Sequence, residues 1–221
     1  AARSPVIRKH FPEDAERYLE KAKDAWKWLQ KNDRCVEYFH YGAVFGDWDE
    51  RCWAAASLYA ATGQEEYHRY FLEHFEPERR HWGWVWLSGA MRPGAVAYAT
   101  LEDRPVDRAM KDRCVEAVRQ MAEFHVACAA AHPYRMTLSS ESIRHGRFGW
   151  VFPDGDHAFE LLVANAVSPD ARYVVAALDN LHYILGASPH GYVLMTGLGW
   201  KRNIEVVDNE STFDGIIEPA P

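Results

Sequence analysis

The sequence predicts an all-α protein built from paired helices, and three observations lead to this fold class. Apolar residues recur at helical spacing in several segments, each bounded by residues that start or end helices. No segment shows a convincing strand-like alternation. Residues 58–67 and 163–173 resemble each other as helical hairpins, each with an apolar helix end, a hydroxyl residue, a helix breaker and a Tyr. Any two hairpins share such features, so the repeat supports the fold class only together with the other observations.

The expected helices follow in chain order, each supported by its periodicity and its boundary residues. Pro12 and the acidic residues after it start the first helix, Gly63 ends the second, Pro133 ends the longest, and Gly186 ends the last. The segments 33–46 and 81–86 contain glycine and aromatic residues and are expected to be irregular. Helices are expected over residues 11–32, 49–62, 65–76, 94–100, 106–131, 156–167 and 170–185.

Two of these helices carry explicit expectations about the core. In the helix 49–62, Trp53 and Leu58 are expected to be buried. The longest helix has an apolar stripe that is expected to face the core, formed by Val106, Met110, Cys114, Val118, Met121, Phe124 and Cys128.

Composition and charge limit the class of protein. With 221 residues, 48% hydrophobic and 26% charged, the chain is expected to form a single helical domain over residues 1–221. A net charge of -7 gives no basic surface, so we expect neither nucleic acid nor a membrane as a partner, and no segment is apolar enough to span one. No signal segment is visible, and the sequence does not predict a localisation.

The cysteines do not indicate whether the protein works in a reducing or an oxidising compartment. Cys114 and Cys128 lie about 21 Å apart on one expected helix, too far for a disulfide, whereas Cys35 and Cys52 pair only if the fold brings them together.

The loop after the last helix carries a family resemblance. Tyr183-Ile184-Leu185-Gly186 is followed by Pro189-His190-Gly191 and by Thr196-Gly197-x-Gly199, and these spacings resemble glycoside hydrolase family 9. That family consists of inverting endoglucanases and related β-glycosidases folded as an (α/α)6 toroid of paired helices. Ser188 departs from the family, which usually has Asn there. The resemblance implies that residues 1–221 are the C-terminal part of a larger catalytic domain, whose partners are an oligosaccharide or polysaccharide and the remainder of the parent chain.

Three carboxylates gather at the start of the second helix, in Asp47-Trp48-Asp49-Glu50. Their simplest role is to complement the helix dipole, but crowded carboxylates beside loop carbonyls also suit calcium. In family 9 enzymes a similar stretch binds calcium, and the resemblance carries that site onto Phe45, Gly46, Asp49 and Glu50. The family's further ligand, an Asp after a Trp, is absent from Trp86-Leu87-Ser88. We therefore expect no required cofactor and keep structural calcium as a minority hypothesis.

Tryptophan and tyrosine are frequent, and rings in loops can serve as flat platforms for sugars. The resemblance indicates Trp82 and Trp150 as substrate contacts and Tyr41 as a hydrogen-bonding residue at the rim of the cleft. Core packing is the competing role for each of these rings.

No catalytic residue is predicted within the chain. Inverting hydrolysis needs two carboxyl groups roughly 6.5–9.5 Å apart. The resemblance implies that the base precedes residue 1 and that the acid follows residue 221. Glu210 is not assigned as the acid, because it lies too soon after Gly199. The segment 202–210 also lacks the family's His- and Arg-rich cluster, which leaves room for a different sugar or a degenerate site.

Two other classes of protein compete with the hydrolase. One is a non-catalytic glycan-binding or scaffold module on the same helices. The other is a terpenoid-cyclase-like domain in which Asp47 to Glu50 would hold magnesium and diphosphate, and the lack of clustered basic residues argues against it.

Overall fold

The computed structural model describes residues 4–32, 38–40, 43–45, 47–77, 91–138, 155–189, 191, 193–195 and 197–199, with the backbone alone at 5, 38–40, 43–45, 91, 92, 155 and 156. The chain divides into two compact units, Ala1–Val118 and Arg119–Pro221. No helix of the described residues combines the length and the apolar character that a bilayer crossing requires. The expected single domain over residues 1–221 stays a prediction.

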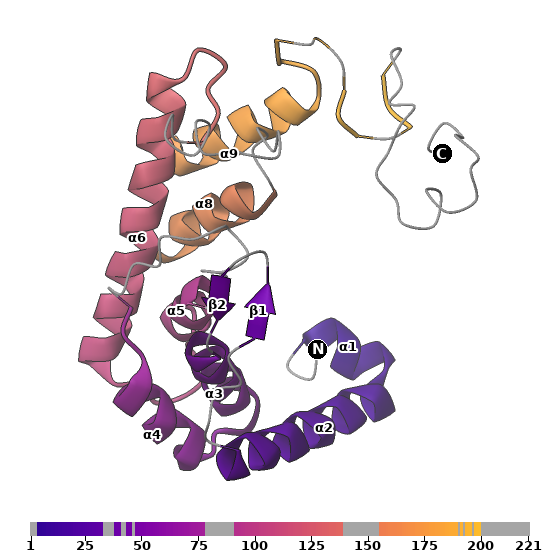
Figure 1. Cartoon of the computed structure of the whole chain (residues 1–221), viewed down its shortest axis with the longest axis vertical. Coiled ribbons are helices and arrows are strands. Elements are labelled where there is room, and N and C mark those ends of the chain that lie inside the picture. The colour runs from indigo at the N-terminus through magenta and orange to yellow at the C-terminus, as the bar shows by residue number, and fades with distance from the viewer. Residues whose placement is uncertain are drawn as a thin grey trace. The chain divides into compact units, whose positions relative to one another are not determined.

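The described residues of the first unit are helical apart from one short hairpin and the connecting turns (Figure 1). Helix α3 packs against α2, α4 and α5, which places it at the centre of this unit. The antiparallel strands pair Tyr38 with Phe45 and His40 with Ala43. In chain order the elements are α1 (Pro5–His10), α2 (Pro12–Lys31), β1 (Tyr38–His40), β2 (Ala43–Phe45), α3 (Trp48–Thr62), α4 (Glu65–His74), α5 (Met91–Ala99) and the first part of α6 (Arg108–Ala131).

Aromatic rings form much of the core of the first unit. Tyr59 stacks on His68 with 4.3 Å between ring centroids, and Phe71 stacks on Tyr98 at 4.7 Å. The Tyr98 hydroxyl lies 2.8 Å from Nε2 of His68 and accepts a hydrogen bond from the Asp107 backbone. Burial raises the pKa of Tyr98 to about 12. Buried rings with satisfied polar atoms therefore tie α3, α4 and α5 together.

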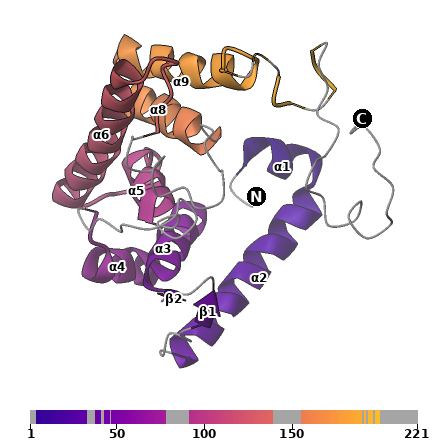
Figure 2. The same ribbon diagram turned by 45° about the horizontal axis from the view of Figure 1, so that its top comes forward.

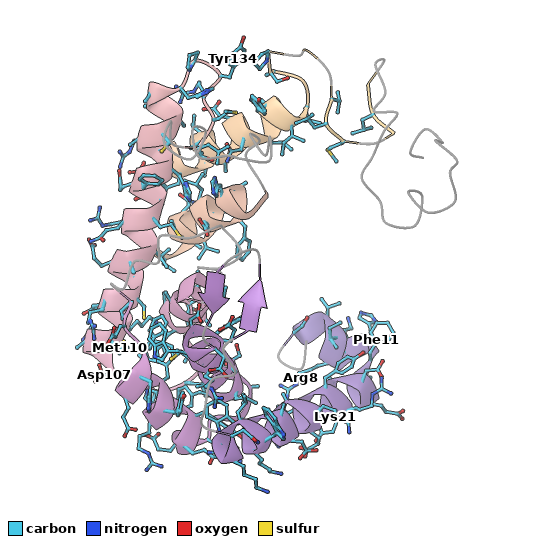
Figure 3. The ribbon with its side chains drawn as sticks, in the orientation of Figure 1. Arg8, Phe11, Lys21, Asp107, Met110 and Tyr134 are labelled. Carbon is cyan, nitrogen blue, oxygen red and sulfur yellow. The ribbon has the colours of Figure 1, made fainter. Side chains whose placement is uncertain are left out.

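Helix α6 begins with a side-chain cap. Asp107 Oδ1 accepts a 2.7 Å hydrogen bond from the backbone N–H of Met110, and Figure 3 labels the two residues together at this end of the helix. The cap explains why α6 starts at Arg108, two residues later than the sequence predicts.

The second unit contains the rest of α6, α8 (Gly155–Val167) and α9 (Ala171–Ile184). Helices α8 and α9 pack against each other, and both lie on the same side of α6 in two views (Figures 1 and 2). Asp170 caps α9 by accepting a hydrogen bond from the Arg172 backbone N–H.

The predicted helices are confirmed, with ends shifted by a few residues, and three short elements were missed. Helix α1 has only six residues, too few for a periodic signal, and Ser4 caps it. The two strands have three residues each, too few for a recognisable alternation. Both hairpins of the internal repeat are present, as α3–α4 and α8–α9. Cys114 and Cys128 form no disulfide with each other, as predicted, and Cys52 forms none either.

The prediction that Trp53 and Phe124 lie in the core is wrong. Trp53 is 45% exposed and Phe124 is 54% exposed. In α6 the buried positions continue after Val118 as Ala122, His125 and Ala129. The stripe of large apolar residues and the stripe that packs thus diverge along α6, because close helix packing selects small side chains and one paired histidine.

The loop after α9 is tightly turned, as predicted. Gly186, Gly191, Gly197 and Gly199 all have positive φ. A Cβ at Gly199 would lie 2.8 Å from Val193 Cγ2, so the turn requires glycine there. The Leu194 N–H donates to the Ile184 carbonyl at 2.8 Å, which fastens the loop to the end of α9.

Candidate functional site

The carboxylate cluster lies at the N-terminus of α3, where Arg51 connects it to α2. The guanidinium donates to the Leu29 and Asn32 carbonyls, each at 2.8 Å, and pairs with Asp47 at 2.8 Å. The last carbonyls of a helix lack intrahelical partners, so Arg51 satisfies those of α2 while Asp47 balances its charge.

Trp48 fixes the other side of this helix start. Its indole Nε1–H donates to the His74 carbonyl at 2.9 Å, and its ring stacks on Phe75 with 6.4 Å between centroids. The first turn of α3 is therefore held between the C-terminal ends of α2 and α4.

Asp49 and Glu50 stand side by side in this first turn. Asp49 is buried, whereas Glu50 is exposed overall. Loss of hydration around its carboxyl, followed by the hydrogen bond with Asp49, raises the pKa of Glu50 to about 7. The thiol of Cys52 lies nearby, and burial with the charges of Asp49 and Glu76 raises its pKa to about 12. Glu50 therefore holds its proton more strongly than an ordinary glutamate does, and the thiol of Cys52 stays protonated and unreactive near neutral pH.

A hard divalent cation would favour the charged form of two crowded carboxyls. The fit to calcium is partial. Phe45 ends β2 and offers its backbone carbonyl, but Gly46 lies outside the described residues. Within the part of the chain that the structure describes, no group of three or more His, Cys, Asp or Glu side chains is arranged to hold a metal. Any calcium here would depend on the two carboxylates and on backbone oxygens.

The predicted sugar contacts are not tested by the structure. Tyr41, Trp82 and Trp150 all lie outside the described residues.

A second polar cluster, which sequence reasoning missed, is buried in the second unit. His125 Nε2 lies 2.7 Å from Glu160 Oε2, and the ring of His125 lies over that of His157 with 4.1 Å between centroids. His157 Nδ1 is 2.8 Å from the Thr137 hydroxyl, which accepts a hydrogen bond from Asn180 Nδ2 at 2.8 Å. All five side chains are buried. The cluster joins α6, α8, α9 and the turn at Thr137, so its evident role is to fix their packing.

Different signals could have found these residues. Asp47 and Arg51 have the i, i+4 spacing of a helical ion pair, which is readable from sequence. The partners of His125 come from segments 12 to 55 residues away along the chain, and no local pattern reveals them.

These helices belong to a known class of protein. The sequence model of Glycosyl hydrolase family 9 matches residues 1–213, and the chain therefore belongs to that family. Endoglucanase D of Acetivibrio thermocellus is 28% identical over 98% of this chain. The xyloglucan-specific endo-beta-1,4-glucanase BoGH9A of Bacteroides ovatus is 23% identical over 96% of it.

Solved structures agree with this assignment. The family 9 endoglucanase J30 is 27% identical, covers 90% of this chain and has a TM-score of 0.75. A metagenome-derived family 9 endoglucanase covers 99% of the chain with a TM-score of 0.78. These enzymes are (α/α)6 toroids, so the predicted fold class is confirmed. The chain spans only 35% of Endoglucanase D and 37% of J30.

Proposed function

We propose that residues 1–221 are part of a glycoside hydrolase whose whole protein cleaves β-linked glucan or a related glycan by an inverting mechanism. The observation that carries this proposal is the family match over residues 1–213. The names of two relatives, an endoglucanase and a xyloglucan-specific endo-beta-1,4-glucanase, support β-glucan as the substrate class. The proposed partners are a polysaccharide or oligosaccharide and the rest of the parent polypeptide.

We assign both catalytic carboxylates to segments outside this chain. Asp49 and Glu50 hydrogen-bond to each other, which is too close for a pair that must admit a water and a glycosidic bond. Glu160 is buried against His125. Glu123 accepts hydrogen bonds from Arg172 and Tyr173. These interactions support structural roles for all four carboxyls.

The test of this assignment is activity of the isolated chain. Residues 1–221 should show no measurable turnover of soluble β-glucan or of aryl β-glucoside and β-glucosaminide. Turnover that disappears in Glu210→Gln would overturn the assignment. The full-length polypeptide should hydrolyse β-glucan with inversion at the anomeric carbon, as NMR of the first-formed product reports. Binding of oligosaccharide by that polypeptide without hydrolysis would favour the non-catalytic glycan-binding module.

We further propose that the reaction itself needs no cofactor, and that the first turn of α3 is the place for a structural calcium. The hydrogen-bonded pair Asp49 and Glu50 favours it, since a cation would remove their mutual repulsion. The carbonyls of Phe45 and Gly46 would complete the ligand set. The ion would stabilise the turn before α3 and would take no part in bond cleavage.

A further inference from the structure

The turn that follows α6 carries an exposed aromatic ring. Tyr134 is 44% exposed, and Figure 3 labels it at this end of α6. Its backbone N–H donates to Nδ1 of His132 at 3.1 Å. Its ring lies edge to face with that of the buried Tyr183 on α9, with 6.5 Å between centroids and 79° between planes. The ring of Tyr134 is therefore held in place by α9, while a large part of it stays open to solvent.

The next residue, Arg135, has a backbone conformation that side chains usually avoid. Its φ is 55°, and none of the other non-glycine residues in the described ranges has a positive φ. Glycine adopts this conformation without steric cost, whereas an arginine does so at a cost in free energy. Strained residues of this kind gather at functional sites. An arginine in this place therefore points to a role for its side chain.

The side chains of Tyr134 and Arg135 reach the same face of α9. Nε of Arg135 donates to Asp179 Oδ2 at 2.6 Å, and the ring of Tyr134 contacts that of Tyr183. Asp179 and Tyr183 are four residues apart in one helix, so they are neighbours on its surface, about one turn apart. The ring of Tyr134 and the Arg135–Asp179 ion pair therefore lie beside each other.

This ion pair keeps unused hydrogen-bonding capacity. The Arg135 side chain is 52% exposed and that of Asp179 is 17% exposed. Among the described residues, none accepts a hydrogen bond from the four Nη N–H groups of Arg135, and none donates to Oδ1 of Asp179. The opposite charges balance each other, so the pair offers donors and an acceptor without selecting an anion.

An open aromatic ring beside a neutral pair of polar groups suits a sugar. A β-linked glucosyl ring carries C–H groups on both faces and its hydroxyl groups around the edge, so a face can stack on an aromatic ring while the edge forms hydrogen bonds. We propose that Tyr134, Arg135 and Asp179 form a binding site for one β-linked glucosyl unit of the substrate. These residues are not among the sugar contacts that the family resemblance indicates. The proposal rests on the proposed function for its substrate class.

Tyr18 on α2 provides a matched control. It is 47% exposed, and its neighbour Arg17 also pairs with an aspartate, Asp14, at 2.7 Å. However, the guanidinium carbon of Arg17 lies 5.4 Å from the centroid of the Tyr18 ring. The cation thus lies over the ring on which a sugar would stack, and we expect no sugar binding at Tyr18.

Calorimetric titration of the full-length polypeptide with a cello-oligosaccharide tests the site. Tyr134→Ala should weaken binding about fivefold, the size of one aromatic contact, and Tyr18→Ala should leave it unchanged. Arg135→Gly should weaken binding severalfold, while the melting temperature stays the same or rises. Glycine adopts the φ of 55° without strain, and an exposed ion pair adds little stability. A purely structural arginine would not separate affinity from stability in this way.

The outcomes distinguish this site from the proposed function. Unchanged affinity in Tyr134→Ala, or an equal loss in Tyr18→Ala, would overturn the site alone. A melting temperature that falls together with the affinity in Arg135→Gly would overturn the sugar contact of its guanidinium. A wild-type polypeptide that binds no cello-oligosaccharide would overturn the substrate class and the site together.

Two further results would support the site. Binding that weakens in Tyr134→Ala, in a polypeptide that does not hydrolyse the sugar, would contradict only the proposed hydrolysis. If Tyr134→Ala fails to fold, Tyr134→Leu keeps an apolar contact with Tyr183 but removes the flat ring, and it should weaken binding to the same extent.

Discussion

At Thr137 a single buried hydroxyl group joins α8 to α9. Replacing it by Val keeps the shape but leaves His157 Nδ1 and the Asn180 amide without this partner. We expect Thr137→Val to lower the free energy of unfolding by about 1–3 kcal/mol, measured by urea denaturation. The control is Thr100→Val, whose exposed hydroxyl donates to the Val96 carbonyl and should matter by only about 0.5 kcal/mol. Equal losses in both variants would contradict this role for Thr137.

Glu123 provides a residue-scale prediction about pH. The hydrogen bond from Tyr173, and then those from Arg172, lower the pKa of Glu123 below its ordinary value of 4.5. Its contribution to stability is thus present above about pH 4.5 and is lost as the pH falls through the folded-state pKa.

Removing the Tyr173 hydroxyl should expose this dependence. Tyr173→Phe should lower the free energy of unfolding by about 1 kcal/mol at pH 7, and the difference from wild type should shrink toward pH 3. Denaturation at several pH values measures it. Tyr134→Phe, at an exposed tyrosine, serves as the control. A difference that stays constant from pH 7 to pH 3 would rule out the coupling to Glu123.

At the scale of elements, the first turn of α3 shows how one helix start serves several purposes. Arg51 completes the end of α2, Trp48 fastens the turn to α4, and Asp49 with Glu50 forms the carboxyl pair. Because Asp47 makes no side-chain cap hydrogen bond, the acidic residues stabilise α3 mainly through its dipole.

Calcium should be detectable through the stability of this turn. Asp49→Ala should cost on the order of 1 kcal/mol without metal, through the lost dipole interaction. If calcium binds as proposed, wild type should melt at a rising temperature as calcium increases, and Asp49→Ala should not respond. Glu66→Ala removes an acidic residue from the first turn of α4 and should keep the response. A wild-type melting temperature that is the same in calcium and in chelator would end the calcium proposal.

At the scale of the whole molecule, the proposed substrate contacts can be separated from core residues. If Trp82 and Trp150 each stack on a sugar ring, Trp→Ala at either position should weaken cello-oligosaccharide binding severalfold, equivalent to about 1 kcal/mol. The melting temperature should then change little. If either tryptophan is instead a core residue, its replacement by Ala should lower the free energy of unfolding by about 3–5 kcal/mol. Calorimetric titration of the full-length polypeptide and thermal melts of each variant distinguish the two roles.

The sequence by itself determined the helices other than α1, their order and most of their ends, because periodicity, Gly63, Asp170 and Gly186 act within a few residues along the chain. The spacing of the late loop was also enough to identify the family, which the match over residues 1–213 confirms.

Only the tertiary structure decided which helix faces are buried. Leu178, Leu181 and Leu185 form a regular apolar stripe, yet they are exposed, while Asn180 and His125 are buried. Hydrophobic periodicity indicates that one face of a helix needs a packing partner, but it does not indicate which segment of the chain supplies that partner. A buried polar side chain is tolerated when a distant residue supplies a hydrogen bond to it, as Glu160 does at Nε2 of His125. Those partners come together only through the packing of helices that are far apart in the sequence.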